Sequence, residues 1–127
     1  MMKGNMPYKL TQQDKKIVDI FTELGMPKNL AKTLTYISQV DECRSAEVEQ
    51  GANLRQPEVS VAMQELKKKG WIDKRDLKKE GKGRPIYIYK LTFPLDNIIS
   101  SFEKEKLQEI EAVKRDITDL KNLLGDR

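Results

Sequence analysis

The stretch RQPEVSVAMQELKKKGWI, residues 55 to 72, contains one short helical pattern that ends in three consecutive lysines. Its apolar side chains recur at spacings of three and four residues, at Val59, Ala62, Met63 and Leu66. This spacing is typical of an amphipathic helix with one buried face. Pro57 suits the first turn of a helix, where amide donors have no partner within the helix. We predict a helix from about 56 to 69 that stops at Gly70.

Two longer helices are predicted near the start of the chain. Thr11, followed by Asp14 at the third position, approximates a capping box for a first helix that ends at Gly25. Its apolar residues at helical spacing are Ile17, Ile20, Phe21 and Leu24. A second helix follows Pro27 and runs to about Val40. Its apolar stripe comprises Leu30, Leu34 and Ile37, and Ala31 is a further candidate for it.

A short third helix and a hairpin flank the helix of residues 56 to 69. Ser45 is the predicted cap of the short helix, which ends at Gly51 or Asn53. The segments WIDKRDL, 71 to 77, and PIYIYKL, 85 to 91, are rich in aromatic and β-branched residues, and the glycine-containing tip KKEGKGR separates them. They predict an antiparallel β-hairpin.

The aromatic residues of the hairpin have more than one interpretation. Trp71 directly follows the glycine that ends a helix, and we favour a packed hinge over a stacking surface. Tyr87 and Tyr89 alternate with Ile86 and Ile88, so one pair is expected to pack inward while the other lies nearer the surface.

A long helix is predicted at the end of the chain, because Leu95 to Leu124 contain no proline or glycine. Thirty helical residues span about 45 Å, which is longer than a small domain requires. Apolar residues repeat there at spacings of 3, 4, 3 and 4, the pattern of a coiled-coil seam. We therefore divide the chain into a domain of residues 1–93 and a dimerisation helix of residues 94–127. The alternative is that the whole helix folds back on a single domain. The predicted dimer interface consists of Ile99, Phe102, Ile110, Val113, Ile117, Leu120 and Leu124.

Composition excludes several functional classes. The chain has 127 residues, of which 38% are hydrophobic and 35% charged, so one small core is expected in a soluble protein. No apolar run approaches the roughly 20 residues of a membrane helix, and the segment MMKGNMPYKL lacks a signal-peptide core, so we expect a cytoplasmic protein. With no histidine and a single cysteine, Cys43, we expect no metal, no cofactor and no enzyme activity. Cys43 is interpreted as a structural thiol rather than a redox switch, because no second cysteine could resolve an oxidised form.

Positive charge is concentrated in one segment. Residues 67–84 contain nine Lys or Arg against three Asp or Glu, whereas residues 94–127 contain six against eight. This distribution suits an anionic partner such as nucleic acid.

The order helix, helix, short helix, helix, basic hairpin is that of a winged helix-turn-helix domain, with the helix-turn-helix at 45–69 and the wing at 71–91. Gln56 and Gln64 have amides that pair with adenine, Ser60 has a hydroxyl for base edges, and Val61 can contact a thymine methyl in the major groove. The predicted contacts to the DNA backbone are Ser45, Lys67, Lys68, Lys78, Lys79, Lys82 and Arg84. For the lysine run, complementarity to the helix dipole is an equally good explanation.

The chain resembles archaeal-type winged-helix transcriptional regulators related to the TrmB and MarR groups. The resemblance covers residues 24–91, through LGMPKNLAKTLTYI, SAEVEQGANLRQPEVSVAMQELKKKGWI and GRPIYIYKL. It implies sequence-specific binding to duplex DNA as a homodimer, with the helix of residues 56–69 in the major groove, and adds Pro57 to the residues that contact bases. Because a two-fold dimer presents two recognition helices, we expect a palindromic site. It also assigns backbone contact to Lys82 and Arg84. Many TrmB-like proteins have a large sugar-sensing domain after the wing, whereas only a helix follows here, so an effector is left open. The alternative function is a protein-interaction module of transcription or chromosome machinery.

Overall fold

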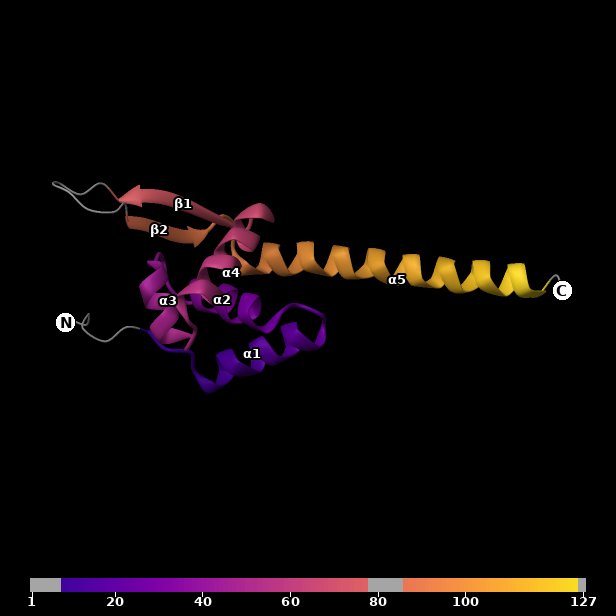
Figure 1. Ribbon diagram of the computed structural model, residues 1–127, viewed down its shortest axis with the longest axis horizontal. Coiled ribbons are helices and arrows are strands. Elements are labelled where there is room, and N and C mark those ends of the chain that lie inside the picture. Colours follow the sequence, from indigo (N-terminus) through magenta and orange to yellow (C-terminus); the bar gives the residue numbers. More distant parts are fainter. Residues whose placement is uncertain (1–7, 78–85, 126–127) are drawn as a thin grey trace. The chain divides into compact units, whose positions relative to one another are not determined.

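The computed structural model describes residues 8–77 and 86–125 (Figure 1). The predicted fold class is confirmed: the described chain is mainly helical, with one antiparallel hairpin and a long C-terminal helix. Its contacts divide it into two compact units, Met1–Pro94 and Leu95–Arg127. The elements, in chain order, are α1 (Gln12–Glu23), α2 (Lys28–Ser38), α3 (Ser45–Gly51), α4 (Gln56–Lys68), β1 (Ile72–Leu77), β2 (Ile86–Leu91) and α5 (Leu95–Gly125).

Helix α1 begins with the predicted capping box. The Asp14 amide donates to Thr11 Oγ1 at 3.1 Å, and the Thr11 amide donates to Asp14 Oδ2 at 2.9 Å. The Tyr8 hydroxyl also donates to the Asp14 carboxylate. These donors allow a carboxylate to be buried, since a buried charge needs hydrogen-bond partners.

The buried face of α1 differs from the predicted stripe. Val18 and Phe21 are buried, whereas Ile20 is 58% exposed and Leu24 is 48% exposed. Helical spacing of the apolar residues therefore did not identify the buried face of α1. The buried cap residue Asp14 turns inward, so the residues four and seven positions later share its face of the helix.

Helix α2 lies at the centre of the first unit. It contacts α1, α3, α4 and β2, and in Figure 1 it lies between α1 and the hairpin. Its predicted apolar stripe is buried, but so are polar residues outside that stripe. The Thr33 hydroxyl donates to the Asn29 carbonyl at 2.9 Å, which satisfies it without an outside partner. The buried residues of α2 are Leu30, Ala31, Thr33, Leu34, Thr35, Tyr36 and Ile37.

Helix α3 begins one residue earlier than predicted, because its cap is Arg44 rather than Ser45. Cys43 exchanges two backbone hydrogen bonds with Tyr89, of 3.0 and 2.8 Å, which keep the chain extended up to Arg44. The Arg44 amide then donates to Glu47 Oε1 at 2.7 Å. Helix α4 starts in the same way, with the Arg55 amide donating to Glu58 Oε1 at 2.8 Å. In both helices the acidic side chain of the first turn satisfies the donor.

Cys43 is buried at this junction, as expected for a structural thiol. Burial raises the pKa of its thiol to about 12, and the negative charges of Glu47 and Glu42 act in the same direction. The thiol is therefore protonated near neutral pH and is a poor nucleophile.

The hairpin is antiparallel, with Ile72 opposite Leu91 and Leu77 opposite Ile86. Trp71 is buried, which confirms the packed hinge, and its carbonyl accepts from the Thr92 amide at 2.9 Å. The expectation that the tyrosines and isoleucines of β2 would separate into buried and surface pairs was wrong. All four side chains, Ile86, Tyr87, Ile88 and Tyr89, are half-buried. A ribbon this narrow covers neither face of β2 completely.

Helix α5 is the predicted long C-terminal helix, with 31 residues. Its buried residues are Ile98 and Phe102, which lie four positions apart and so share one face. Phe102 was predicted to belong to a dimer interface, but it is only 7% exposed in the single chain, so that assignment is corrected. Five apolar residues follow the spacing of 3, 4, 3 and 4 and are here called the seam. They are between 47% and 62% exposed: Ile110, Val113, Ile117, Leu120 and Leu124.

Gly51 offers a test of how the first unit packs. A Cβ at this position would collide with the ring of Tyr36 and the backbone carbonyl of Tyr8. We expect Gly51→Ala to lower the free energy of unfolding by about 1–3 kcal/mol, the cost of overpacking. Chemical denaturation measures it, and Gly125→Ala is the control because its added Cβ meets open space. Equal stability of the two variants would show that the Tyr8 segment does not pack as described.

Candidate nucleic-acid interface

A hollow of about 330 Å³, here called the α4–hairpin groove, lies between the exposed side of α4 and the hairpin. It brings together five residues that the sequence predicted for DNA contact: Ser45, Gln56, Ser60, Gln64 and Lys67. The start of α3 supplies the serine, and successive turns of α4 supply the others. The groove thus combines amides, hydroxyls and a cation on one concave surface. Its remaining residues are Met63, Lys74, Tyr87 and Tyr89.

The hairpin contributes residues that sequence reasoning did not select. The Lys74 ammonium lies 4.3 Å from the centre of the Tyr87 ring, and Lys74 stands opposite Tyr89 in the strand register. Strand alternation already placed the two tyrosines on the same face of β2. The sequence does not give the register of the two strands. That register places Lys74 opposite Tyr89, and so on the side of the hairpin that lines the groove.

Pro57 and Val61 lie in a different place from the other residues predicted to contact bases. They line a second hollow of about 590 Å³, the α2–α4 groove, together with Pro27 and Leu30. Val61 is 67% exposed there. The full lining is Pro27, Asn29, Leu30, Pro57, Glu58, Val61, Ala62, Glu65 and Lys69. The predicted set therefore falls on two sides of α4, and the second side has two carboxylates.

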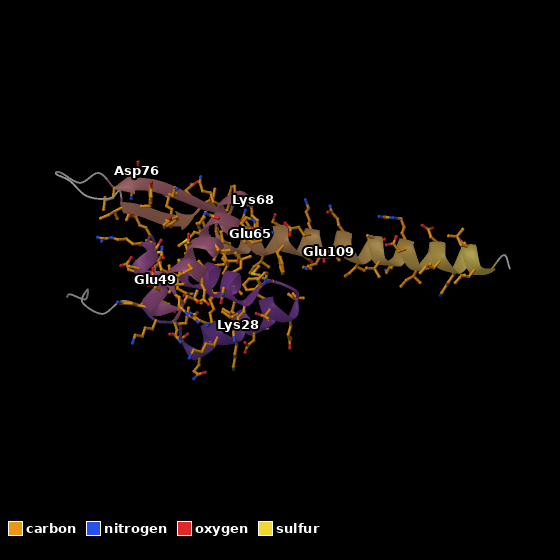
Figure 2. All side chains as sticks on the ribbon, viewed as in Figure 1. Lys28, Glu49, Glu65, Lys68, Asp76 and Glu109 are labelled. Atoms are coloured by element: carbon orange, nitrogen blue, oxygen red, sulfur yellow. The ribbon has the colours of Figure 1, made fainter. Side chains whose placement is uncertain are left out.

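The three lysines at the end of α4 differ in their surroundings. Lys67 lines the α4–hairpin groove, and Lys69 lies over the Trp71 ring with its ammonium 4.9 Å from the ring centre. Lys68 is exposed, as Figure 2 shows for the labelled side chain. Lys67 and Lys68 occupy the last turn of the helix, where cations complement the dipole. Contact with phosphates and complementarity to the helix dipole both fit this placement of the lysines.

The predicted wing-tip contacts Lys78, Lys79, Lys82 and Arg84 lie outside the described residues. In the described strands, the cations differ in their partners. The Arg75 guanidinium binds both carboxylate oxygens of Glu42, at 2.9 and 3.1 Å. Lys90 stands opposite Asp73, and alternation directs it to the face away from Lys74. Lys74 is therefore the strand cation that belongs to the groove.

The described residues form neither a metal site nor a membrane-spanning helix. Within residues 8–77 and 86–125, no cluster of three or more cysteine or acidic side chains is arranged to hold a metal ion. In the same part of the chain no helix has the length and apolar character needed to cross a membrane.

Comparison with known proteins gives matches in structure alone. No protein-family model and no curated protein sequence matches this chain. Among solved structures, TrmBL2, an archaeal chromatin protein whose structure shows a novel mode of DNA binding, is similar with a TM-score of 0.59 and 18% identity. A possible transcriptional regulator from Methanosarcina mazei gives a TM-score of 0.62 and 16% identity. A MarR-family transcription regulator gives a TM-score of 0.51 and 17% identity.

The extent of these matches differs. The similarity covers 89% of this chain but 44% of TrmBL2, so the chain spans less than half the length of that protein. It covers 83% of this chain and 87% of the Methanosarcina protein, and 90% and 82% for the MarR-family regulator. The chain therefore has the winged helix-turn-helix fold found in TrmB-type and MarR-family transcriptional regulators.

Proposed function

We propose that this protein is a sequence-specific, double-stranded DNA-binding transcriptional regulator that acts as a homodimer, with α4 in the major groove. The observation that carries the proposal is the α4–hairpin groove, whose lining combines amides that can pair with bases and cations that suit phosphates. The fold shared with transcription regulators supports the same conclusion.

The base-contacting residues follow one edge of α4. Gln56, Ser60 and Gln64 are spaced four residues apart, so they form a row about 12 Å long at 1.5 Å per residue. Such a row spans roughly three to four base pairs of B-DNA at 3.4 Å each. Glutamine amides pair with adenine through two hydrogen bonds, and a serine hydroxyl accepts or donates at several base edges.

Backbone contact is assigned to the cations that flank this row. Lys67 follows the row on α4, and Lys74 lines the same groove from the hairpin. Ser45 and Lys68 are further contacts in the proposal, together with the wing-tip residues Lys78, Lys79, Lys82 and Arg84. Phosphate contacts fix the position of a protein on the duplex but do not distinguish sequences.

Pro57 and Val61 have a narrower role in the proposal. Glu58 and Glu65 line the same groove as these two residues, and carboxylates repel phosphates. Apolar contact with a thymine methyl, deep in the major groove, is the interaction that remains suitable for Val61. The α4–hairpin side is therefore assigned the greater share of base recognition.

Base recognition is tested with Ser60→Ala combined with Gln64→Ala. Selection of bound duplexes from a random pool should yield a palindrome for the unmodified protein. The double variant is expected to bind that duplex about tenfold or more weakly and to lose preference at the contacted positions, because each good base contact contributes about 1–3 kcal/mol. Ser100→Ala combined with Gln108→Ala is the matched control, since both residues are exposed on α5. Unchanged affinity and preference would show that this edge of α4 does not contact bases.

The phosphate contacts are tested with Lys67→Ala combined with Lys74→Ala. We expect the variant to bind all duplexes more weakly. The slope of log affinity against log salt concentration should also become less steep by about 2, roughly one for each lost phosphate contact. The control is Lys16→Ala combined with Lys90→Ala, two exposed lysines outside the groove. If neither pair changes affinity or salt slope, the winged domain serves as a protein-interaction module instead.

Dimerisation is assigned to the exposed seam of α5. In heptad positions, Ile110, Ile117 and Leu124 occupy position a, while Val113 and Leu120 occupy position d. In the heptad of Ile117 and Leu120, isoleucine at a is combined with leucine at d, which favours two-stranded parallel coiled coils. With about half of each seam side chain exposed, a partner helix would remove a continuous apolar stripe from water. Ile99, also exposed and on the same helix, is a further proposed contact.

The charges beside the seam indicate the direction of the partner. Glu109 and Asp116 occupy position g, and Lys114 and Lys121 occupy position e; all four are exposed. In a parallel pair, each g residue faces the e residue five positions later on the other helix, so Glu109 meets Lys114 and Asp116 meets Lys121. An antiparallel pair would bring acid to acid and lysine to lysine. We therefore propose a parallel, in-register homodimer, whose two-fold axis suits a palindromic site.

The direction of pairing is tested with Lys114→Gln combined with Lys121→Gln. A parallel dimer should dissociate about threefold or more readily, because up to four ion pairs of a few tenths of a kcal/mol each are lost. Sedimentation equilibrium measures this change. Lys104→Gln combined with Arg115→Gln removes the same charge from outward heptad positions and should have little effect. Tighter association of the first variant would indicate antiparallel helices, and a monomeric protein would rule out the seam.

A further inference from the structure

A third hollow, of about 590 Å³, lies on a different part of the first unit from the two grooves beside α4. We call it the lysine hollow, because four lysines line it with a single acidic residue, Asp19. Helices α1 and α2 form two sides, and the turn between α3 and α4 forms a third. In Figure 2, Lys28 lies on the α1 side of the unit, away from the hairpin that contains Asp76. The lining residues are Lys9, Leu10, Lys15, Val18, Asp19, Lys28, Lys32, Gln50, Gly51, Ala52 and Asn53.

The lysines of the hollow form no ion pair within 4.0 Å with any residue in the described part of the chain. They are Lys9, Lys15, Lys28 and Lys32. Four positive charges against one carboxylate leave the hollow with a formal charge of +3. Like charges that converge on a concave surface repel one another, and the surrounding low-dielectric walls strengthen the field. A bound anion would relieve this repulsion.

Backbone contacts hold the walls of the hollow in place. The Leu10 amide donates to the Gly51 carbonyl at 3.0 Å, which ties the segment before α1 to the end of α3. The Tyr8 ring packs edge-on against Tyr36, with ring centres 5.6 Å apart. This close approach requires the absent side chain of Gly51. Asn53 adopts a left-handed conformation with φ of 56°, which asparagine tolerates better than most residues. These contacts fix the backbone around the hollow, so its shape is part of the folded structure.

Besides the lysines, the lining has residues that could contact the uncharged part of a bound anion. Leu10 is half-buried and gives the hollow an accessible apolar surface, whereas Val18 and Ala52 lie almost completely buried behind the lining. Gln50 and Asn53 supply amides, and Asp19 supplies a carboxylate that accepts hydrogen bonds from hydroxyl or amino groups. A volume of this size is typical of small-molecule sites.

We propose that the lysine hollow binds a small phosphorylated molecule of the nucleoside diphosphate class. The lysines would hold the phosphates, and the apolar surface, the amides and Asp19 would contact the nucleoside. Lys28 and Lys32 are one helical turn apart on α2, so both ammonium groups can reach one diphosphate. This assignment does not depend on the proposed binding of DNA.

Calorimetric titration of the full chain with ADP, inorganic pyrophosphate and adenosine, at constant ionic strength, tests the proposal. ADP is expected to bind more tightly than either pyrophosphate or adenosine. Lys28→Gln combined with Lys32→Gln should weaken ADP at least about tenfold, because two charge-assisted contacts are lost. Lys16→Gln combined with Lys90→Gln removes the same charge outside the hollow and should leave ADP binding unchanged. Circular dichroism verifies that both variants are folded, and Lys9→Gln combined with Lys15→Gln replaces the first variant if it is not.

Three outcomes would overturn the proposal. One is the absence of ADP binding at millimolar concentration, and another is an equal loss of affinity in the test and control variants, which would indicate general attraction by a basic protein. The third is a variant at Lys28 and Lys32 that loses affinity for duplex DNA but not for ADP. In that case the hollow would extend the DNA-binding surface. Because ADP is titrated without DNA, a failed DNA-binding proposal would leave this result unaffected.

Discussion

The burial of α2 on nearly all sides is the constraint on which the first unit depends. Its residues contact α1, α3, α4 and β2, so each of these elements takes its position from the same central helix. The packing leaves no room for a side chain at Gly51, where the end of α3 meets Tyr36. Interiors this dense transmit the shape of one element to the next. Helix α4 is consequently presented with one face buried and two edges open.

The two open edges of α4 have different chemistry. The edge toward the hairpin has amides, hydroxyls and cations, while the edge toward α2 has Pro57 and Val61 between carboxylates. A helix that lies in the major groove turns its whole outer surface toward the bases and phosphates. The asymmetry of charge would therefore orient α4 within the groove, with the hairpin edge nearer to a phosphate backbone. Lys74 contributes to that edge from a strand, which links the hairpin to the helix it follows.

In the proposed functions, helix α5 and the lysine hollow bind partners other than duplex DNA. The seam of α5 is apolar and half exposed, with charges beside it that match a second copy of the same helix. The lysine hollow is concave, basic and partly lined by the turn between α3 and α4. None of the residues that line the lysine hollow lines the α4–hairpin groove.

The sequence by itself determined the kinds of elements and their order, because hydrophobic period, capping residues and glycines are local signals. It indicated the buried stripe of α4, the capping box at Thr11 and the uninterrupted helix after Leu95. Only the tertiary structure decided which polar residues are buried in α2, which face of α1 turns inward and where α3 begins. It also decided that Lys74 lies beside α4, and that Pro57 and Val61 lie on another edge from Gln64. These features depend on strand register and on contacts between residues far apart in the chain, and helical or strand periodicity contains no information about either.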